Sequence, residues 1–336
     1  MMQAQITNKP NYGKLIKNIG KILEQGRKQA YTAVNIILLQ TYWQIGKEII
    51  NFEQKGQERA EYGTQLLEKL SADLKINYGK GFSRRNVLDM RRFYLFNKKW
   101  QTVSAKLSWS QYVELLHIDN DLERKFYQIQ SEKEKWSVRE LKRQINSALF
   151  QRLALRKDKQ NIIKLSKEGN TTIQAQDMVK DPYILEFLKI PENYDYSERE
   201  LEQKIIDNLQ MFLLELGKGF SFVARQYRIT LGNKHYYVDL VFYNRILKCF
   251  VLIDLKIGGA SHHDVGQMNT YLNYFKKEEQ TEGDQDPIGI ILAAGKDDFE
   301  IEFALGSITN KLFVSKYKLY LPNKKELIER LQTIQK

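Results

Sequence analysis

The sequence predicts an α-helical N-terminal domain, helix-turn-helix-like, followed by an α/β C-terminal domain with a mixed central sheet flanked by helices. Three observations predict this. A chain of 336 residues is long enough for two hydrophobic cores. Apolar residues recur at helical spacing up to about residue 150, whereas strand-like runs appear after residue 220. Residues 1–180 hold 33 Lys and Arg against 18 Asp and Glu, and residues 181–336 hold 20 against 23.

The uneven charge suggests different partners for the two halves. A basic front half is typical of a domain that binds a polyanion, although solvated helix faces give the same excess. We expect a basic all-helical nucleic-acid-binding domain over residues 12–155, a polar linker over 156–181 and a second domain over 182–336. The sequence has no apolar run of membrane-spanning length and no secretory segment near Met1, which predicts a cytoplasmic protein without membrane contact.

The N-terminal half contains several predicted helices. Ile16, Ile19 and Leu23 follow helical spacing and are expected to face the core, and a further helix is expected over residues 61–76. Serines at positions 108 and 137 precede two more helical segments, and the second has capping-box spacing.

A glycine-containing turn and the N-cap residue Ser83 precede a helix over residues 84–94 that carries four arginines. This order, in which a helix and a turn precede a helix that carries arginines, is typical of a helix-turn-helix DNA-binding motif. An amphipathic core helix with a solvated Arg face is the alternative. The overall positive charge favours contacts with nucleic acid by Arg84, Arg85, Arg91 and Arg92.

The sequence pattern of the second half predicts, in chain order, a helix, a meander of three strands, a second helix and a further strand. An amphipathic helix begins near Ser197 and ends at Gly217 or Gly219. The predicted strands cover residues 222–231, 235–243 and 248–257, a helix covers about 263–277, and a buried strand covers 288–293.

The central stretch of this half is the strand FVLIDLKIG. Asp254 and Lys256 are two residues apart and therefore project from the same face of the strand. Asp239, in the preceding strand HYYVDLVFY, can approach Asp254 across an antiparallel pair. Two close carboxylates repel unless a proton or a cation lies between them, and Mg²⁺ uses such oxygen ligands together with substrate phosphates. A structural ion pair at the strand end is the alternative.

This pattern resembles the PD-(D/E)XK nuclease superfamily. Asp239 matches the strand-borne Asp, and Asp254-Leu255-Lys256 matches (Asp/Glu)-x-Lys. The resemblance implies a helical acid, for which Glu202 is preferred and Glu200 is the competitor. Gln267 and Tyr271 are similar to the Gln-x-x-x-Tyr element of the RecB-like branch. The sequence departs from the motif at Val238, where the motif has Pro, and in having Asp rather than Glu at position 254.

More of the chain, roughly residues 12–325, resembles the bacterial YhcG-like family, in which a basic helical domain precedes a PD-(D/E)XK domain. The segments that carry the resemblance are FSRRNVLDMRRFY, LSWSQYVELL, GKGFSFVARQYRI, YVDLVFYNRILKCFVLIDLKIG and GQMNTYLNYF. The resemblance implies a nuclease that uses Mg²⁺ or Mn²⁺. The implied metal ligands are Glu202, Asp239, Asp254 and the carbonyl of Leu255.

The residues then take the following expected roles. Asp239, Asp254, Lys256 and Gln267 form the catalytic set, and Gln267 and Tyr271 also contact nucleic acid. Gly258, Arg225 and Gln226 are secondary candidates near the site.

DNA is the expected substrate and RNA is the alternative, with attack at an end or within a strand left open. A non-catalytic DNA-binding or assembly protein on a nuclease scaffold is a further alternative. The presence of all the motif's charges argues against that scaffold. Self-association into a homo-oligomer also stays open.

Overall fold

The computed structural model describes residues 10–55, 60–155, 159–170, 175–180, 182–191, 195–296, 305–306 and 309–334. The chain divides into two compact units, Met1–Arg124 and Lys125–Lys336. Residues 125–155, which the sequence analysis assigns to the N-terminal domain, group with the second unit in this division. The predicted linker contains two helices, Lys159–Glu168 and Ala175–Met178. The exact domain boundaries stay a prediction.

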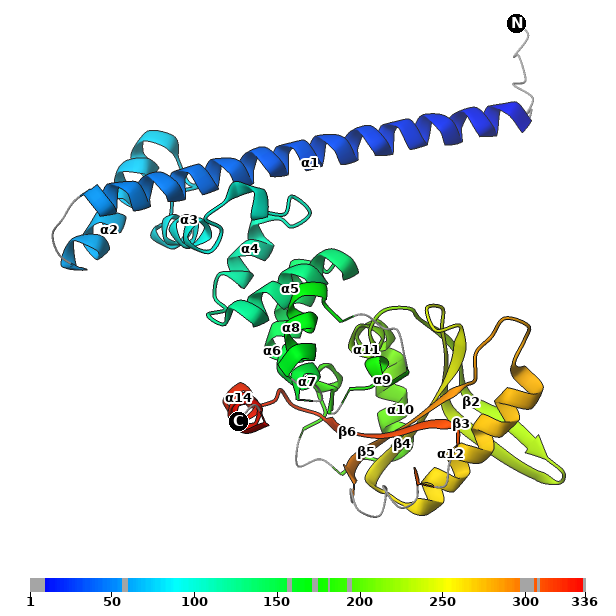
Figure 1. Ribbon diagram of the computed structural model, residues 1–336. Helices are drawn as coiled ribbons and strands as arrows, with labels where there is room; N and C mark the ends of the chain where they lie inside the picture. The colour runs from blue at the N-terminus through cyan, green and yellow to red at the C-terminus, as the bar shows by residue number, and fades with distance from the viewer. Residues whose placement is uncertain are drawn as a thin grey trace, which may run out of the picture. The chain divides into compact units, whose positions relative to one another are not determined.

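The described part of the N-terminal unit is helical, as predicted (Figure 1). Its elements are α1 (Pro10–Lys55), α2 (Ala60–Tyr78), α3 (Arg84–Phe96), the 3₁₀ turn η1 (Trp100–Thr102), α4 (Trp109–Leu115) and the start of α5 (Asp121–Glu134). The predicted caps are present, because the Ser83 hydroxyl accepts from the Asn86 N–H at 3.2 Å and Ser108 forms a capping box with Gln111.

Among the described side chains of α1, the buried ones all lie from Asn35 onward. Leu39 and Ile49 are buried there, and a Cβ added to Gly46 would lie 2.1 Å from the Met90 carbonyl oxygen of α3, so this glycine permits close helix contact. The expectation that Ile16, Ile19 and Leu23 face the core was wrong: they are 53%, 44% and 56% exposed. Their spacing is helical, but no other described element of the N-terminal unit covers that part of α1.

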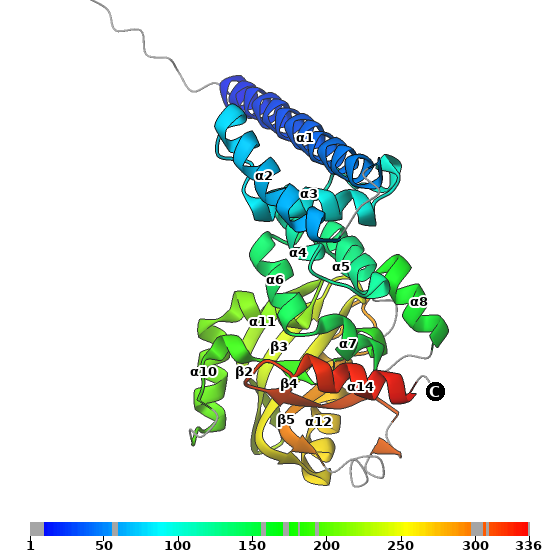
Figure 2. The ribbon, with the colours of Figure 1, turned by 90° about the vertical axis from the view of Figure 1, so that its left-hand side faces the viewer.

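The second unit begins with helices and ends with one. After α5 come α6 (Val138–Asn146), α7 (Leu149–Ala154), α8 (Lys159–Glu168), α9 (Ala175–Met178), the 3₁₀ turn η2 (Glu186–Leu188), α10 (Glu198–Asp207), α11 (Leu209–Leu216), α12 (His262–Tyr274), the π-helical turn η3 (Phe275–Glu279) and α14 (Lys324–Ile334). Figure 2 shows α14 beside α7. The single helix predicted from Ser197 to Gly217 is broken at Asn208, whose side chain donates to the Lys204 carbonyl at 2.9 Å.

The sheet of the second unit is mixed, as predicted. Its strands are β1 (Tyr183–Ile184), β2 (Phe220–Leu231), β3 (Lys234–Asn244), β4 (Cys249–Ala260), β5 (Ile288–Lys296) and β6 (Lys311–Lys318). Their order across the sheet is β1-β6-β5-β4-β3-β2. The β2–β3–β4 meander is antiparallel, whereas β4, β5, β6 and β1 run parallel to one another.

Helices cover both faces of this sheet (Figure 1). On one face α10 and α11 pack through Leu201, Ile205 and Phe212 onto a core that includes Phe242 and Ile253. On the other face α12 packs against the strands with this set of buried side chains: Val241, Leu252, Val265, Met268, Leu272 and Ile291. The antiparallel meander and the first turns of α10 and α12 therefore position the side chains discussed below.

A buried ion network links the first helices of the second unit to the sheet. Glu215 is fully buried and accepts hydrogen bonds from Arg152 Nη1 at 2.7 Å and Arg143 Nη1 at 3.1 Å. Burial alone would raise the pKa of Glu215, but the neighbouring Arg152, Lys180 and Arg143 lower it to about 2. Burial lowers the pKa of Lys180 to about 8. These charges are paired, which is the condition under which charged side chains stay buried.

Candidate functional site

Asp239 and Asp254 meet on the adjacent antiparallel strands β3 and β4. Leu240 pairs with Ile253 in the ladder, so Asp239 and Asp254 lie opposite each other at the next step. The backbone N–H of Leu255 donates to Asp239 Oδ2 at 2.8 Å. This hydrogen bond fixes the Asp239 carboxylate beside β4 at the position from which Asp254 projects.

Lys256 projects into the same cluster. Its Nζ lies 2.9 Å from Asp254 Oδ2, and two further carboxylates lie within 4 Å: Asp264 Oδ1 at 3.8 Å and Glu198 Oε2 at 3.9 Å. Glu198 is in the first turn of α10, and Asp264 is in the first turn of α12, where it accepts from the Ser261 N–H at 2.8 Å. The starts of two helices on opposite faces of the sheet therefore supply acids around one ammonium group.

Burial and neighbouring charges shift the pKa values of Asp254 and Lys256. Burial, together with the charge of Asp239, raises the pKa of Asp254 to about 7, although Lys256 acts in the opposite direction. Burial alone would lower the pKa of Lys256, but Asp254 outweighs it, so the pKa of the ammonium lies above its usual value. Lys256 is therefore a cation at neutral pH, beside two carboxylates that repel each other.

Gln226 connects the helical acid to this cluster. Its Nε2 donates to Glu202 Oε2 at 2.6 Å and to Asp239 Oδ1 at 2.9 Å. Gln226 has φ +47°, a conformation that costs a non-glycine residue about 1 kcal/mol or more. The strained backbone directs the amide between two acids that the chain separates by 37 positions.

Glu202 is only 3% exposed. Arg225 Nε lies 2.9 Å from Glu202 Oε1, but without hydrogen-bond geometry, so this buried oxygen has a charge partner and no hydrogen-bond donor. Glu200 is elsewhere: its carboxylate accepts from the Ser197 N–H at 2.8 Å and caps α10. Of the two acids considered from the sequence, the structure brings Glu202 close to Asp239.

Sequence reasoning did not identify Glu198 and Asp264 as neighbours of Lys256. Asp264 has capping-box spacing from Ser261, but that signal predicts a helix start and nothing about a lysine on a strand. Only the packing of α10 and α12 on opposite faces of the sheet brings the two acids to it.

Gln267 and Tyr271 lie one turn apart on α12, as predicted. The Gln267 amide donates to the Tyr271 hydroxyl, and this hydroxyl donates to the Tyr237 carbonyl at 3.1 Å. Tyr271 is 1% exposed, and burial raises the pKa of its phenol. The phenol thus links α12 to β3, whereas Gln267 is exposed. Contacts of either residue with nucleic acid stay a prediction.

The four predicted arginines lie on α3 of the N-terminal unit. Arg84 is exposed and its Nε lies 3.2 Å from Glu68 Oε1. Arg91 Nη2 lies 2.8 Å from Glu53 Oε2, and its Nε also donates to this carboxylate, so Arg91 links α3 to α1. Arg85 and Arg92 lie close enough to the buried Asp89 to lower its pKa, although burial raises that pKa overall. The sequence spacing could not show that Arg91 stabilises helix packing.

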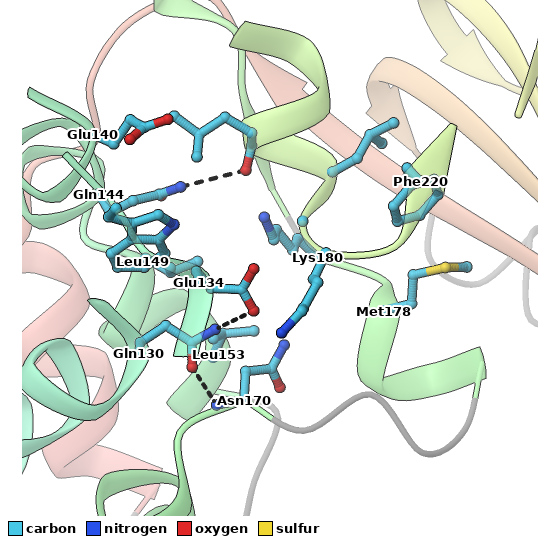
Figure 3. Close-up of a pocket in the computed structure, with 15 residues that line it drawn as sticks. Gln130, Glu134, Glu140, Gln144, Leu149, Leu153, Asn170, Met178, Lys180 and Phe220 are labelled. Carbon is cyan, nitrogen blue, oxygen red and sulfur yellow. Dashed lines mark hydrogen bonds between the residues drawn. The ribbon is translucent and has the colours of Figure 1, made fainter. Parts of the chain in front are cut away.

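The second unit also has a partly open cavity of about 130 Å³ that Asp239, Asp254 and Lys256 do not line (Figure 3). Gln130 connects two of its walls, because its amide donates to Glu134 Oε1 at 3.4 Å and its oxygen accepts from the Asn170 N–H at 2.8 Å. Lys180 lines the cavity and donates to the Glu215 carbonyl. None of the predicted site residues lines it.

A closed metal cage is not part of the described structure. Among the described residues, no group of three or more His, Cys, Asp or Glu side chains is arranged to hold a metal ion. The carboxylates instead share a lysine and a glutamine amide. Among the residues that the structure describes, no helix is both long enough and apolar enough to cross a membrane.

Comparison with known families assigns both parts of the chain. Residues 176–332 match the YhcG PDDEXK nuclease domain, and residues 18–152 match the DUF1016 N-terminal domain. The chain is also 37% identical to the Escherichia coli (strain K12) protein named "Putative nuclease YhcG", over 95% of this chain and 93% of that protein. The chain belongs to the YhcG family. In this YhcG-family chain, Glu202, Asp239, Asp254 and Lys256 all lie within the matched nuclease domain.

Two solved structures are similar to part of this YhcG-family chain. A repair endonuclease from Pyrococcus abyssi is 23% identical, with a TM-score of 0.27, and the match covers 39% of this chain and 50% of that one. EndoMS in a complex with double-stranded DNA is 18% identical, with a TM-score of 0.26, and the match covers 40% and 50%. The chain therefore spans about half the length of these solved chains.

Proposed function

We propose that this YhcG-family chain is a divalent-metal-dependent nuclease that hydrolyses phosphodiester bonds of DNA. The observation that carries the proposal is the convergence of Asp239, Asp254 and Lys256 where the pairing of β3 with β4 ends, with Glu202 connected to Asp239 by a single amide. Buried charges of this kind cost several kcal/mol each unless they are paired, so a cluster of them is a candidate functional site.

The donor chemistry fits a hard divalent cation. Glu202 Oε1 is buried without a hydrogen-bond donor, and Asp239 and Asp254 are held close despite their repulsion. Mg²⁺ commonly uses one or two carboxylates plus substrate phosphates and water, so a complete protein cage is not required. We assign Asp239 and Asp254 as the first ligands. Glu202 and the carbonyl of Leu255 complete the set, with Mg²⁺ or Mn²⁺ as the cation.

The bound cation would supply Lewis acidity toward a phosphate oxygen and increase the acidity of a nearby water. The chain's residues do the rest. Lys256 places a positive charge where negative charge develops on the phosphate during hydrolysis, and its three acidic neighbours fix the position of that ammonium. Gln226 donates from one amide nitrogen to both Glu202 and Asp239 and so holds these two acids near each other. Exposed Gln267 is available to contact the substrate backbone.

The basic N-terminal half is proposed to supply affinity for DNA. The excess of 33 basic over 18 acidic residues in residues 1–180 suits contacts with phosphate. We assign Arg84, Arg85 and Arg92 to such contacts. Arg91 has an additional structural role through Glu53. Tyr271 would act on nucleic acid only indirectly, by fixing α12.

A cleavage assay tests the proposal. Purified protein is incubated with plasmid, linear and single-stranded DNA and with RNA, each with Mg²⁺, Mn²⁺ or chelator. We expect metal-dependent DNA cleavage that Asp239→Asn reduces by about 100-fold or more, because a ligand is lost. The control is Asp286→Asn, which removes a half-exposed carboxylate that pairs with Lys276.

Three results contradict parts of the proposal. Cleavage that continues in chelator removes the role of the metal. Cleavage of RNA and not of DNA would show that the substrate is RNA. DNA binding without cleavage under any condition, and without any effect of Asp239→Asn, leaves a non-catalytic scaffold.

A further inference from the structure

Residues 12–37 of α1 form an apolar face that no other described part of the N-terminal unit covers. Nine large apolar side chains on this face are 36% to 69% exposed. They are Tyr12, Leu15, Ile16, Ile19, Ile22, Leu23, Val34, Ile36 and Ile37. An uncovered apolar strip of this length, about 40 Å at 1.5 Å per residue, is unusual on a monomer and marks an interaction surface.

The strip follows a heptad repeat. The two central positions of the repeat alternate at spacings of three and four residues: Tyr12, Ile16, Ile19, Leu23, Gly26, Ala30, Ala33 and Ile37. The charged residues of this region lie outside those positions: Lys14, Lys17, Lys21, Glu24, Arg27 and Lys28. Such a 3.5-residue repeat is typical of a helix that packs along another helix.

The opposite side of α1 packs within the N-terminal unit. Asn35 is buried, and its amide donates to the Ala105 carbonyl at 3.0 Å and the Leu107 carbonyl at 2.9 Å, while Leu39 is fully buried. The heptad strip therefore points away from the helices that α1 contacts.

The glycines of α1 give independent support. A glycine inside a helix costs about 1 kcal/mol relative to alanine. At Gly46 the close contact with Met90 of α3 explains the glycine. A Cβ at Gly13, Gly20 or Gly26 would meet nothing within 4 Å. All three lie on or beside the heptad strip, where they would allow a second helix to approach closely.

We infer that this strip binds the same strip of a second copy of the chain, as an antiparallel coiled coil. In an antiparallel pair the two central heptad positions face each other across the interface. The register that aligns Leu23 with Gly26 of the second copy also aligns Ile19 with Ala30 and Ile16 with Ala33. Each of these layers combines one large and one small side chain.

A parallel pair would stack each residue on its own copy. The layers at Gly26, Ala30 and Ala33 would then contain only small side chains and those at Ile16, Ile19 and Leu23 only large ones, so the helix spacing would have to change along the pair. The antiparallel pair keeps these three layers at similar volume and has two large side chains only in its end layer, Tyr12 with Ile37, so even packing favours it. At roughly 80 Å² for each exposed side chain, the nine would bury on the order of 700 Å² per copy, close to the ~800 Å² of a standard specific interface.

Sedimentation equilibrium of the full chain tests the inference. We expect a dimer at micromolar concentration. Ile19→Glu should raise the dissociation constant of the dimer by more than about 100-fold, because both copies would bury an unpaired carboxylate. The control is Lys17→Glu, which introduces the same residue on the outer side of the same turn. Circular dichroism checks that both variants keep their helices. A monomeric wild-type chain, or equal effects of the two variants, overturns the inference.

Cysteine crosslinking tests the direction. Cys249 is the chain's one cysteine and is 1% exposed, so introduced thiols react without interference. Residues 16 and 33 are about 25 Å apart along one helix, too far for an internal disulfide. The double variant Ile16→Cys with Ala33→Cys should form a covalent dimer on oxidation, and neither single variant should. Crosslinking of Ile16→Cys alone indicates a parallel pair and refutes the register.

A lipid surface is the other occupant that an apolar strip with basic flanks could bind. The wild-type chain is mixed with vesicles of phosphatidylglycerol and phosphatidylcholine and centrifuged. A monomer that sediments with the vesicles, and loses this binding with Ile19→Glu, overturns the dimer in favour of a membrane surface. A chain that is dimeric and stays in the supernatant supports the antiparallel dimer. This inference does not depend on the nuclease proposal, since it concerns assembly and is measured without substrate.

Discussion

Replacing Asp254 by asparagine is expected to abolish cleavage and at the same time to stabilise the metal-free protein. The Asp254 side chain is 4% exposed, and burial with the nearby Asp239 raises its pKa from 3.8 to about 7. At about 1.4 kcal/mol for each tenfold change in proton affinity, the charged form costs on the order of 4 kcal/mol at pH 8. This cost already includes the attraction of Lys256, so asparagine, which removes the charge, should recover most of it, and we expect a net gain of about 2–4 kcal/mol.

The gain should depend on pH. A carboxyl whose pKa is raised in the folded state destabilises that state above the raised value, and this effect disappears as the pH falls to the unfolded value. The advantage of Asp254→Asn should therefore be complete above about pH 7 and vanish near pH 4. Mg²⁺ should stabilise the wild-type chain at pH 8 and leave the variant unchanged, because the variant lacks a proposed ligand.

Urea unfolding followed by hydrogen exchange of β3 and β4 peptides measures this effect in the second unit alone. Asp264→Ala is the control with the opposite sign, because Asp264 caps α12 and its loss should cost about 1 kcal/mol. The reasoning fails if Asp254→Asn is less stable than the wild-type chain at pH 8 in chelator, or if its advantage is the same at pH 4.

Three further predictions concern other charged residues. Lys256→Met should lower kcat about 10²- to 10³-fold with little change in DNA affinity, and an unchanged kcat in steady-state assays would remove Lys256 from catalysis. Glu215→Gln should cost about 3–5 kcal/mol, because it leaves the charges of Arg152 and its neighbours buried without their acid; a loss below 1 kcal/mol in urea unfolding would contradict this. Arg92→Ala should weaken DNA binding and reduce by about 1 the slope of log binding constant against log salt concentration. Arg91→Ala should mainly lower the stability of the fold. DNA-binding titrations measure the first effect, and thermal melts measure the second.

Local sequence signals determined most of the elements of the second unit. Alternation and β-branched runs predicted β2, β3, β4 and β5, and helical spacing with a serine cap predicted the start of α10. These signals arise within a few residues of one another, because side-chain direction and helix capping are local properties. β1 and β6 were not predicted, since the two-residue β1 has no period and exists through its pairing with β6.

The site was predictable where two charges share one strand. Asp254 and Lys256 are two positions apart, and their contact at 2.9 Å follows from strand geometry. The Gln226 bridge depends on a positive φ and on α10 lying against β2, and no local pattern encodes either. Likewise, helical spacing at Ile16 and Ile19 indicates which residues share a face of α1 but not what covers that face.

The sequence by itself determined the family, the order of helices and strands, and the strand that carries an acid and a lysine. Tertiary structure decided which distant acids join them: it brings Glu202, the acid preferred from the family resemblance, to Asp239 through Gln226, and it alone places Glu198 and Asp264 around Lys256. The physical reason is range. Periodicity and capping act over one or two turns, whereas a charge cluster is assembled by chain packing, which brings together side chains that the sequence separates by tens of residues.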